Sequence, residues 1–164
     1  MRILGIDPGS RVTGYGFVEY VNSGFTYIAS GCIRTPKGAL CERLGVIYAS
    51  LDALILEFAP HEVAIEEVFM ARNPQSALKL GQARGAAIAA VAIKKLSLSE
   101  YAARSVKKAL TGTGGASKEQ VQHMVKVILN LSETPAEDAA DALAIAICHV
   151  NTQGLARMIK SDKK

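Results

Sequence analysis

The order of strand-like and helix-like segments limits the fold more than any other feature of this sequence. Residues 2–7 form a short apolar run, as in a strand buried on both faces, and alternating segments at 12–20 and 25–34 follow after turn residues. Further along, strand patterns at 62–68 and 98–102 alternate with helix patterns. Three antiparallel strands followed by helix–strand units predict an α/β protein with a five-stranded mixed sheet and helices on both faces.

The helix boundaries carry their own signals. Apolar residues at helical spacing predict a helix over 38–59, which Pro60 ends. Asn73 followed by Pro74 marks a helix start, with small residues inside that helix that permit close packing against another helix or a second subunit. Ser117 with Gln120, and Thr134 with Glu137, have the spacing of capping boxes. The expected helices are 74–95, 103–110, 117–131 and a final one beginning near 134.

Composition excludes several classes of protein. The apolar stretch at 85–93 is too short to cross a bilayer, so we expect no membrane association. The N-terminal segment does not have the pattern of a signal peptide, and three scattered cysteines fit neither a disulfide framework nor a zinc site, so we expect a cytoplasmic protein. No linker divides the chain, which predicts a single domain over 1–157 and a basic, flexible tail over 158–164.

The net charge of +4 averages two unlike regions. Residues 72–130 contain ten Lys and Arg against two acidic residues, whereas the rest of the chain has an excess of acids. We expect contacts to a phosphate backbone in this basic region. The alternative is that lysines on its helices only keep an exposed surface hydrated.

Carboxylates occupy positions where an unused acid is costly. Asp7 ends a strand that should be central, and Glu66 and Glu67 follow the apolar residues of another interior strand. Asp7 also suits the first position of a tight turn, so a turn role and a functional role are both open. Since neighbouring strand residues point to opposite faces, only one of Glu66 and Glu67 can share a face with Asp7, and alternation does not choose between them.

Asp138 and Asp141 lie three residues apart on the final helix and therefore share a face. Helical spacing puts Ile145 and His149 on that face as well, opposite a core-facing stripe that contains Leu143 and Ile147. A second interpretation of the pair is that both are only exposed acids near a helix N-terminus. His149 is too far along the axis to join a site at Asp141, so we expect it, like the small residue Cys148, to be structural. His123 has no acidic pattern beside it.

Taken together, strand-end carboxylates and an Asp pair on a helix can converge on a hard divalent cation. Oxygen-only ligands suit Mg²⁺ or Mn²⁺. Two such ions would hold the attacking water and the leaving oxygen of an in-line phosphodiester displacement, beside a basic surface for a nucleic acid.

Six segments closely match one family. The chain resembles the RuvC family of bacterial Holliday junction resolvases over nearly its whole length. The matching segments are GIDPGSRVTGYG (5–16), SGCIRT (30–35), FMARNPQSALKLGQARG (69–85), EYAARSVKKAL (100–110), SKEQVQHMV (117–125) and DAADALAIAI (138–147).

The resemblance implies a ribonuclease-H-like fold, a homodimer and Mg²⁺, with two ions expected in each active site. It places the metal-binding catalytic carboxylates at Asp7, Glu66, Asp138 and Asp141, and so selects Glu66 over Glu67. It also implies DNA-binding roles for four further residues, with Phe69 stacking on a base near the crossover and Lys107 and Lys118 lying near the scissile phosphate or the junction. The fourth residue is Arg72.

The implied activity is symmetric nicking of two opposed strands of a four-way junction, in homologous recombination and DNA repair, with RuvA and RuvB as partners. Two alternatives share part of the pattern: another ribonuclease-H-like nuclease, such as a YqgF-like protein, and a non-catalytic junction-binding protein. A sugar-kinase or actin-like ATPase also begins with a similar turn, but 164 residues are too few for its two large domains.

Overall fold

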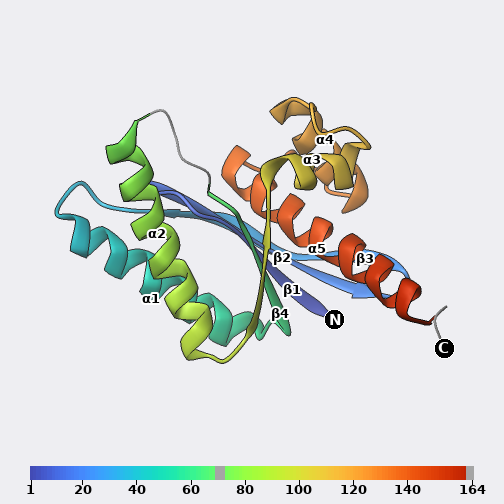
Figure 1. The fold of residues 1–164 in the computed structure, drawn as a ribbon, viewed down its shortest axis with the longest axis horizontal. Coiled ribbons are helices and arrows are strands. Elements are labelled where there is room, and N and C mark those ends of the chain that lie inside the picture. The colour runs from blue at the N-terminus through green and yellow to red at the C-terminus, as the bar shows by residue number, and fades with distance from the viewer. Residues whose placement is uncertain (69–72, 162–164) are drawn as a thin grey trace.

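A computed structural model of the chain describes residues 1–68 and 73–161, and the surroundings of side chains as far as residue 153. Five strands and five helices make up this part of the chain (Figure 1). In chain order they are β1 (Arg2–Asp7), β2 (Val12–Val21), β3 (Gly24–Arg34), α1 (Leu40–Phe58), β4 (Glu62–Glu66), α2 (Pro74–Ile93), β5 (Ser97–Tyr101), α3 (Ala103–Thr111), α4 (Lys118–Ile128) and α5 (Glu137–Ser161).

The strands form one mixed sheet in the order β3-β2-β1-β4-β5. Strand β1 pairs antiparallel with β2, where Asp7 lies opposite Gly14, and parallel with β4, where Ile6 lies opposite Ile65. The β4–β5 pair is also parallel. The predicted five-stranded mixed sheet is confirmed, and β1 is its central strand.

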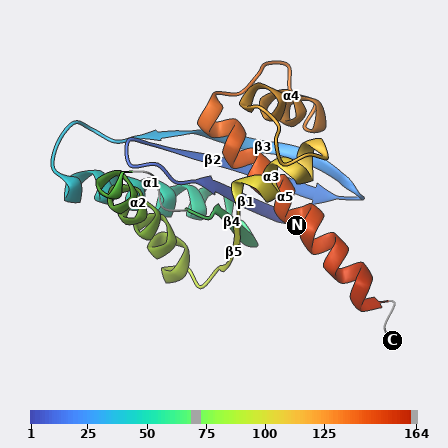
Figure 2. The ribbon, with the colours of Figure 1, turned by 45° about the horizontal axis from the view of Figure 1, so that its top comes forward.

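Helices cover both faces of the sheet, as predicted. Helices α1 and α2 lie together on one face, and α3, α4 and α5 lie on the other (Figures 1 and 2). Alternate residues of β1 enter the two cores: Leu4 and Ile6 pack with α1 and α2, whereas Ile3 packs with α5. Asp7 therefore points to the same face as Ile3, the face covered by α5.

Two predicted helix caps are present. The Asn73 side chain accepts hydrogen bonds from the backbone N–H groups of Gln75 (2.9 Å) and Ser76 (3.4 Å) at the start of α2. At the start of α4, Gln120 accepts from the backbone N–H of Ser117 at 2.8 Å, and the Ser117 hydroxyl accepts from that of Gln120 at 3.3 Å. Helix α4 ends at Ile128 rather than near 131, and β4 ends at Glu66 rather than 68.

Two expectations for the final helix are wrong. Helix α5 begins at Glu137 and not at Thr134, and the carbonyl of Pro135, ahead of the helix, accepts a hydrogen bond from the Gln122 side chain of α4 at 3.2 Å. The helix is also not one-sided, because both its expected faces are buried between Ala142 and Val150. The reason is that α5 is enclosed by the sheet on one side and by α3 and α4 on the other.

Glycines bring α5 unusually close to the sheet. A methyl group on Gly5 of β1 would overlap the backbone carbonyl of Ala142, and one on Gly14 of β2 would overlap that of Asp138. One on Gly16, which pairs with Gly5, would lie 2.7 Å from the side chain of Leu143. The backbone of α5 therefore rests almost directly on β1 and β2, and its acidic first turns lie over the end of β1. No helix in the described residues is long and apolar enough to cross a membrane.

Candidate active site

Two carboxylates are brought together by strand pairing alone. Asp7 ends β1 and Glu66 ends β4, and the parallel register that aligns Ile6 with Ile65 places the two acids side by side. Both point to the face covered by α5, and they share a hydrogen bond in which Asp7 donates. Glu67 points the other way, into a hollow with Arg84 and Glu100. The structure thus brings Glu66, and not Glu67, to Asp7.

A pocket of about 310 Å³ opens beside this pair. Helix α5 adds the carboxylate of Asp141, and two cations face it from α3 and α4, Lys107 and Lys118. Apolar side chains complete the wall of the pocket: Ala103, Val106, Val121 and Ile145. Three of the four predicted carboxylates and both predicted lysines therefore share one cavity.

Asp138, the fourth predicted acid, lies at the edge of this group. It is half-buried, and its backbone rests on Gly14, the residue paired with Asp7. It does not line the pocket, but its charge contributes to raising the pKa values of both Asp7 and Asp141. The four acids are consequently electrostatic neighbours, with Asp138 on the β2 side of Asp7.

Crowding of negative charge changes how readily these acids ionise. Burial, reinforced by the charges of Glu66 and Asp141, raises the pKa of Asp7 to about 8. Burial raises the pKa of Asp141 to about 6, although Lys118 opposes the shift. Burial also raises the pKa of Glu66, against the hydrogen bond from Asp7 and the charges of Lys118 and Lys107. Crowded carboxylates of this kind are stabilised by binding a proton or a cation, because either one reduces the repulsion between their negative charges.

Lys118 is held at the mouth of the pocket. Its ammonium group forms an ion pair with Glu137 in the first turn of α5, which raises the pKa of the lysine. The carboxylates of Asp141 and Asp7 act in the same direction. Lys118 is therefore a cation that remains charged beside the acids, as binding of a phosphate requires.

The acids surround the pocket rather than closing on one point. Among the described residues, no three His, Cys, Asp or Glu side chains are grouped tightly enough to enclose an ion by themselves. This arrangement fits Mg²⁺, which keeps several waters and is usually held by one or two carboxylates together with substrate phosphate oxygens. The all-oxygen donor set and the mutual repulsion of the carboxylates both suit that ion.

The sequence patterns do not point to one further contact at the site. Arg84 of α2 reaches the end of β4 from the opposite face of the sheet, where its Nε donates to the Glu66 carbonyl oxygen at 3.2 Å. The same guanidinium pairs with Glu100 of β5. Arg84 therefore anchors the backbone that carries the Glu66 carboxylate. It lies within the 69–85 match, but no spacing in the sequence singles it out.

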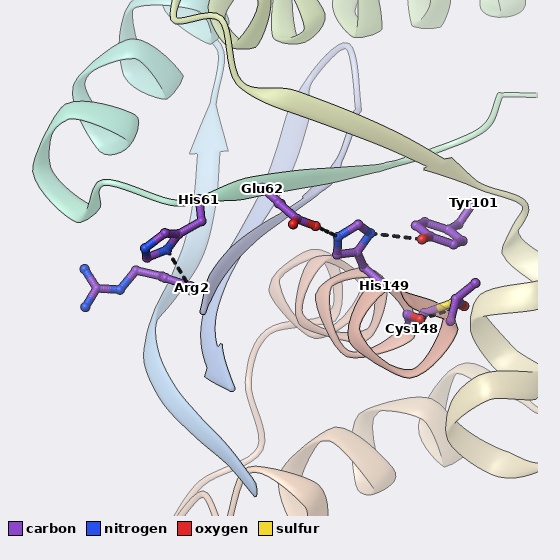
Figure 3. Close-up of polar contacts among 7 residues, drawn as sticks. Arg2, His61, Glu62, Tyr101, Cys148 and His149 are labelled. Carbon is purple, nitrogen blue, oxygen red and sulfur yellow. Dashed lines mark hydrogen bonds and ion pairs between the residues drawn. The ribbon is translucent and has the colours of Figure 1, made fainter. Parts of the chain in front are cut away.

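His149 has the structural role expected of it: it is buried and joins two partly exposed side chains in a polar network (Figure 3). Its Nε2 lies 2.6 Å from Glu62 Oε2, and its Nδ1 lies 2.9 Å from the Tyr101 hydroxyl. This network joins α5 to β4 and β5, two turns of helix beyond Asp141. Cys148 is buried beside it, as expected, and His123 lies in a separate hollow between α3 and α4. Two predicted DNA-binding residues, Phe69 and Arg72, lie outside the described residues.

Comparison with known proteins identifies the family of this chain. The family model described as crossover junction endodeoxyribonuclease RuvC matches residues 3–149. The chain belongs to the RuvC family. The RuvC protein of Marinobacter nauticus is 56% identical over 163 residues, which cover 99% of this chain and 93% of that protein.

Solved RuvC structures share the fold. The Thermus thermophilus RuvC structure superposes with a TM-score of 0.87 at 35% identity, covering 95% of this chain and 97% of that one. The same protein in complex with a Holliday junction substrate gives a TM-score of 0.86 at 34% identity, with coverages of 94% and 96%. The predicted ribonuclease-H-like fold and the predicted class of enzyme, a crossover junction endodeoxyribonuclease and thus a hydrolase of recombination and repair, are confirmed by these matches.

Proposed function

We propose that this chain resolves Holliday junctions by paired, symmetric nicks in two opposed strands, and that each nick is made at the pocket lined by Asp7, Glu66 and Asp141. The observation that supports this best is the meeting of three acids with Lys107 and Lys118 in one cavity. Family membership and the junction-bound Thermus thermophilus relative support a four-way junction as the substrate.

The carboxylates of Asp7, Glu66, Asp138 and Asp141 would hold Mg²⁺, with Mn²⁺ as a substitute and two ions in each site. The fit rests on the oxygen-only donors and on the raised pKa of Asp7, since a cation relieves the repulsion that raises it. Bound Mg²⁺ would supply activation of the attacking water and stabilisation of the leaving oxygen.

The chain's own cations and aromatic side chain would position the DNA strand. Lys118 and Lys107 would bind the oxygens of the scissile phosphate and stabilise the charge that develops on them. Phe69 would stack on a base at the crossover, and Arg72 would bind the backbone beside it. Arg84 would hold Glu66 in place through its backbone carbonyl.

Two opposed cuts call for two copies of the site, related by a two-fold axis. A homodimer meets this need, and α2 offers the exposed side chains Leu78 and Ile93 for a subunit contact. We further propose that residues 1–157 act as a single nuclease domain, that 158–164 form a basic tail, and that the enzyme works with RuvA and RuvB in the cytoplasm.

The decisive experiment compares wild type with Asp7→Asn on a synthetic four-way junction and on linear duplex. Wild type should make paired nicks on opposed strands with Mg²⁺ and none with EDTA. Asp7→Asn should bind the junction but not cut it, because the substitution removes a carboxylate from the centre of the site. Asp52→Asn is the matched control, since Asp52 pairs with Lys94 between α1 and α2, away from the pocket.

Each alternative function predicts a different result. A non-catalytic junction-binding protein gives no nicks with either chain. Equal cutting by Asp7→Asn contradicts the carboxylate assignment. A nuclease of another specificity cuts linear duplex as fast as the junction.

A further inference from the structure

A second group of cations lies near the carboxylates, outside the basic region 72–130. The turn after Asp7 and the segment after β3 are joined by two hydrogen bonds to the carbonyl oxygen of Arg11, from the backbone N–H of Thr35 at 3.0 Å and from its hydroxyl at 3.3 Å. Three cationic residues are exposed where these two segments meet: Arg11, Arg34 and Lys37. We call these three residues the Arg11–Arg34 patch.

The backbone beneath the patch is fixed by side chains. Buried Thr13 closes the turn, since its hydroxyl donates to the Gly9 carbonyl at 2.9 Å. Arg43 of α1 donates to the Ser10 carbonyl and, at 3.3 Å, to the Thr35 hydroxyl. The Arg43 guanidinium is thus occupied in holding the two segments together, whereas Arg11 and Arg34 extend from a rigid base towards solvent.

Arg34, on β3, lies on the same face of the sheet as the acids. Gly14 of β2 faces Asp138 and pairs with Cys32 of β3, and Arg34 is two residues beyond Cys32 on the same side of that strand. Strand spacing of about 4.8 Å and a rise of about 3.3 Å per residue place the Cα of Arg34 about 12 Å from that of Asp7. An extended arginine can span much of that distance.

The order of the strands shows on which side of the acids Arg34 lies, because β3 is separated from β1 by β2. Burial and the Asp138 charge raise the pKa of Cys32, and Arg34 opposes them, so Arg34 and Asp138 both act on this part of β3. Lys107 and Lys118 line the pocket together with Asp7, Glu66 and Asp141, whereas Asp138 does not line it. Across the sheet the order is therefore Arg34 on β3, Asp138 over β2, Asp7 on β1 and Glu66 on β4, and the two lysines face the pocket, which Asp138 does not line. The acids lie between two separate groups of cations.

This inference rests on the function proposed above. We propose that the Arg11–Arg34 patch binds backbone phosphates of the cleaved strand on the opposite side of the scissile phosphate from Lys107 and Lys118. A nucleic-acid strand crossing the pocket has to pass the acids, whose negative charge repels it until cations offset them. Cations on both sides hold the strand across that gap at two points, which fixes the phosphate between them. Glu42, in the first turn of α1 nearby, leaves the patch with an excess of positive charge.

The test is the salt dependence of junction binding, measured in EDTA so that no cutting occurs. The variants are Arg34→Gln and Arg11→Gln/Arg34→Gln. The control is Lys95→Gln, which removes one exposed charge at the opposite ends of the strands, just before Ser97 of β5. The double variant should bind at least about fivefold more weakly near 0.15 M salt. Its plot of log affinity against log salt should flatten by about 0.9 for each phosphate that the variant no longer neutralises.

Cleavage with Mg²⁺ at saturating protein is the second measurement. The rate of cutting by the double variant should fall by a smaller factor than its affinity, because the patch binds backbone phosphates beside the reacting phosphate and not the reacting phosphate itself. Arg11→Lys/Arg34→Lys, which keeps both charges, should restore most of the affinity. Melting temperatures confirm that each variant is folded, and both arginines are exposed, so little change is expected.

The outcomes separate this inference from the function on which it rests. If the double variant has the same affinity and the same salt slope as Lys95→Gln, the proposed role of the patch is wrong. The proposed function still holds in that case, provided that wild type cuts the junction. A loss of cutting at saturation without a loss of affinity also overturns it. If wild type itself neither prefers nor cuts a junction, the proposed function fails.

Discussion

The two faces of the sheet are packed in different ways. Towards α1 and α2 the core consists of large side chains, among them Leu4, Ile6, Phe17, Ile47 and Leu51. Towards α5 large side chains such as Ile3, Val18 and Leu143 also form a core, but glycines of β1 and β2 lie directly against the backbone of the helix as well. The first face is held by interlocking side chains alone, and the second by interlocking side chains together with a close approach of main chains.

This difference explains where the acids are found. An interface of large side chains can absorb a small shift by changing rotamers, whereas a backbone resting on glycine has no side chain to move. Asp138 and Asp141 belong to the helix whose position is fixed in the second way, and Asp7 lies on the strand beneath it. We call the side of the sheet where Gly5 and Gly14 lie against α5 the close face. The close face therefore sets the spacing of the carboxylates, and the face covered by α1 and α2 contributes to the overall stability of the fold.

The strongest test of this comparison is Gly5→Ala. Its methyl group would overlap the Ala142 carbonyl, so α5 or β1 must shift. We expect a loss of about 3 kcal/mol or more in the free energy of unfolding, measured in urea, and a loss of junction cutting in any protein that still folds. Gly45→Ala is the matched control, because the space around this exposed helical glycine is open, and it should stabilise α1 by about 0.5–1 kcal/mol.

Leu51→Ala is the counterpart on the other face. It removes a fully buried side chain and should cost about 2–4 kcal/mol, yet leave the rate of cutting by folded protein within about twofold of wild type. The comparison of the two faces is wrong if Gly5→Ala cuts normally or if Leu51→Ala loses cutting while folded.

Much of this architecture could be predicted from sequence, because local patterns determine it. Alternation and turn residues indicated the strands, and Asn73 and Ser117 indicated two helix starts through hydrogen bonds to near neighbours. Asp7 stood out because burying an unpaired carboxylate at the end of an apolar strand is costly unless it has a function. The choice of Glu66 over Glu67 needed either the family resemblance or the register of β1 with β4.

Other features depend on contacts between distant segments. The burial of α5 on both sides follows from α3 and α4 packing over it, which helical periodicity does not reveal. The roles of Gly5 and Gly14 depend on which helix lies above them. Arg84 donates to the backbone carbonyl of Glu66. Because every residue has a backbone carbonyl, no pattern of side chains in the sequence predicts this contact.

A third prediction concerns pH and the metal-free protein. Because the pKa of Asp7 rises from 3.8 unfolded to about 8 folded, the folded chain keeps a proton that the unfolded chain loses. Stability from this group is present below about pH 4 and falls as pH increases towards 8. The raised pKa values of Asp141 and Glu66 act in the same direction.

In EDTA, the urea midpoint should therefore fall as pH rises between about 5 and 8, and Mg²⁺ should restore it by binding the folded state. Asp7→Asn should flatten the dependence and be more stable than wild type by about 2 kcal/mol at pH 8. Asp52→Asn should follow the wild-type curve. A wild-type midpoint that rises over this range contradicts the crowding of charge at the close face.

The smallest predicted effect tests whether side-chain hydrogen bonds also hold α5 to the close face. Tyr101→Phe removes the hydroxyl that bonds His149 Nδ1 and leaves the ring in place, so we expect a cost of about 1 kcal/mol in urea unfolding. Tyr27→Phe is the control, since its hydroxyl meets Ser30 on exposed β3 at 3.2 Å and its loss should cost almost nothing. Equal costs for the two variants would mean that the His149 network adds no more than a surface contact, and that glycine and core packing without it set the position of α5.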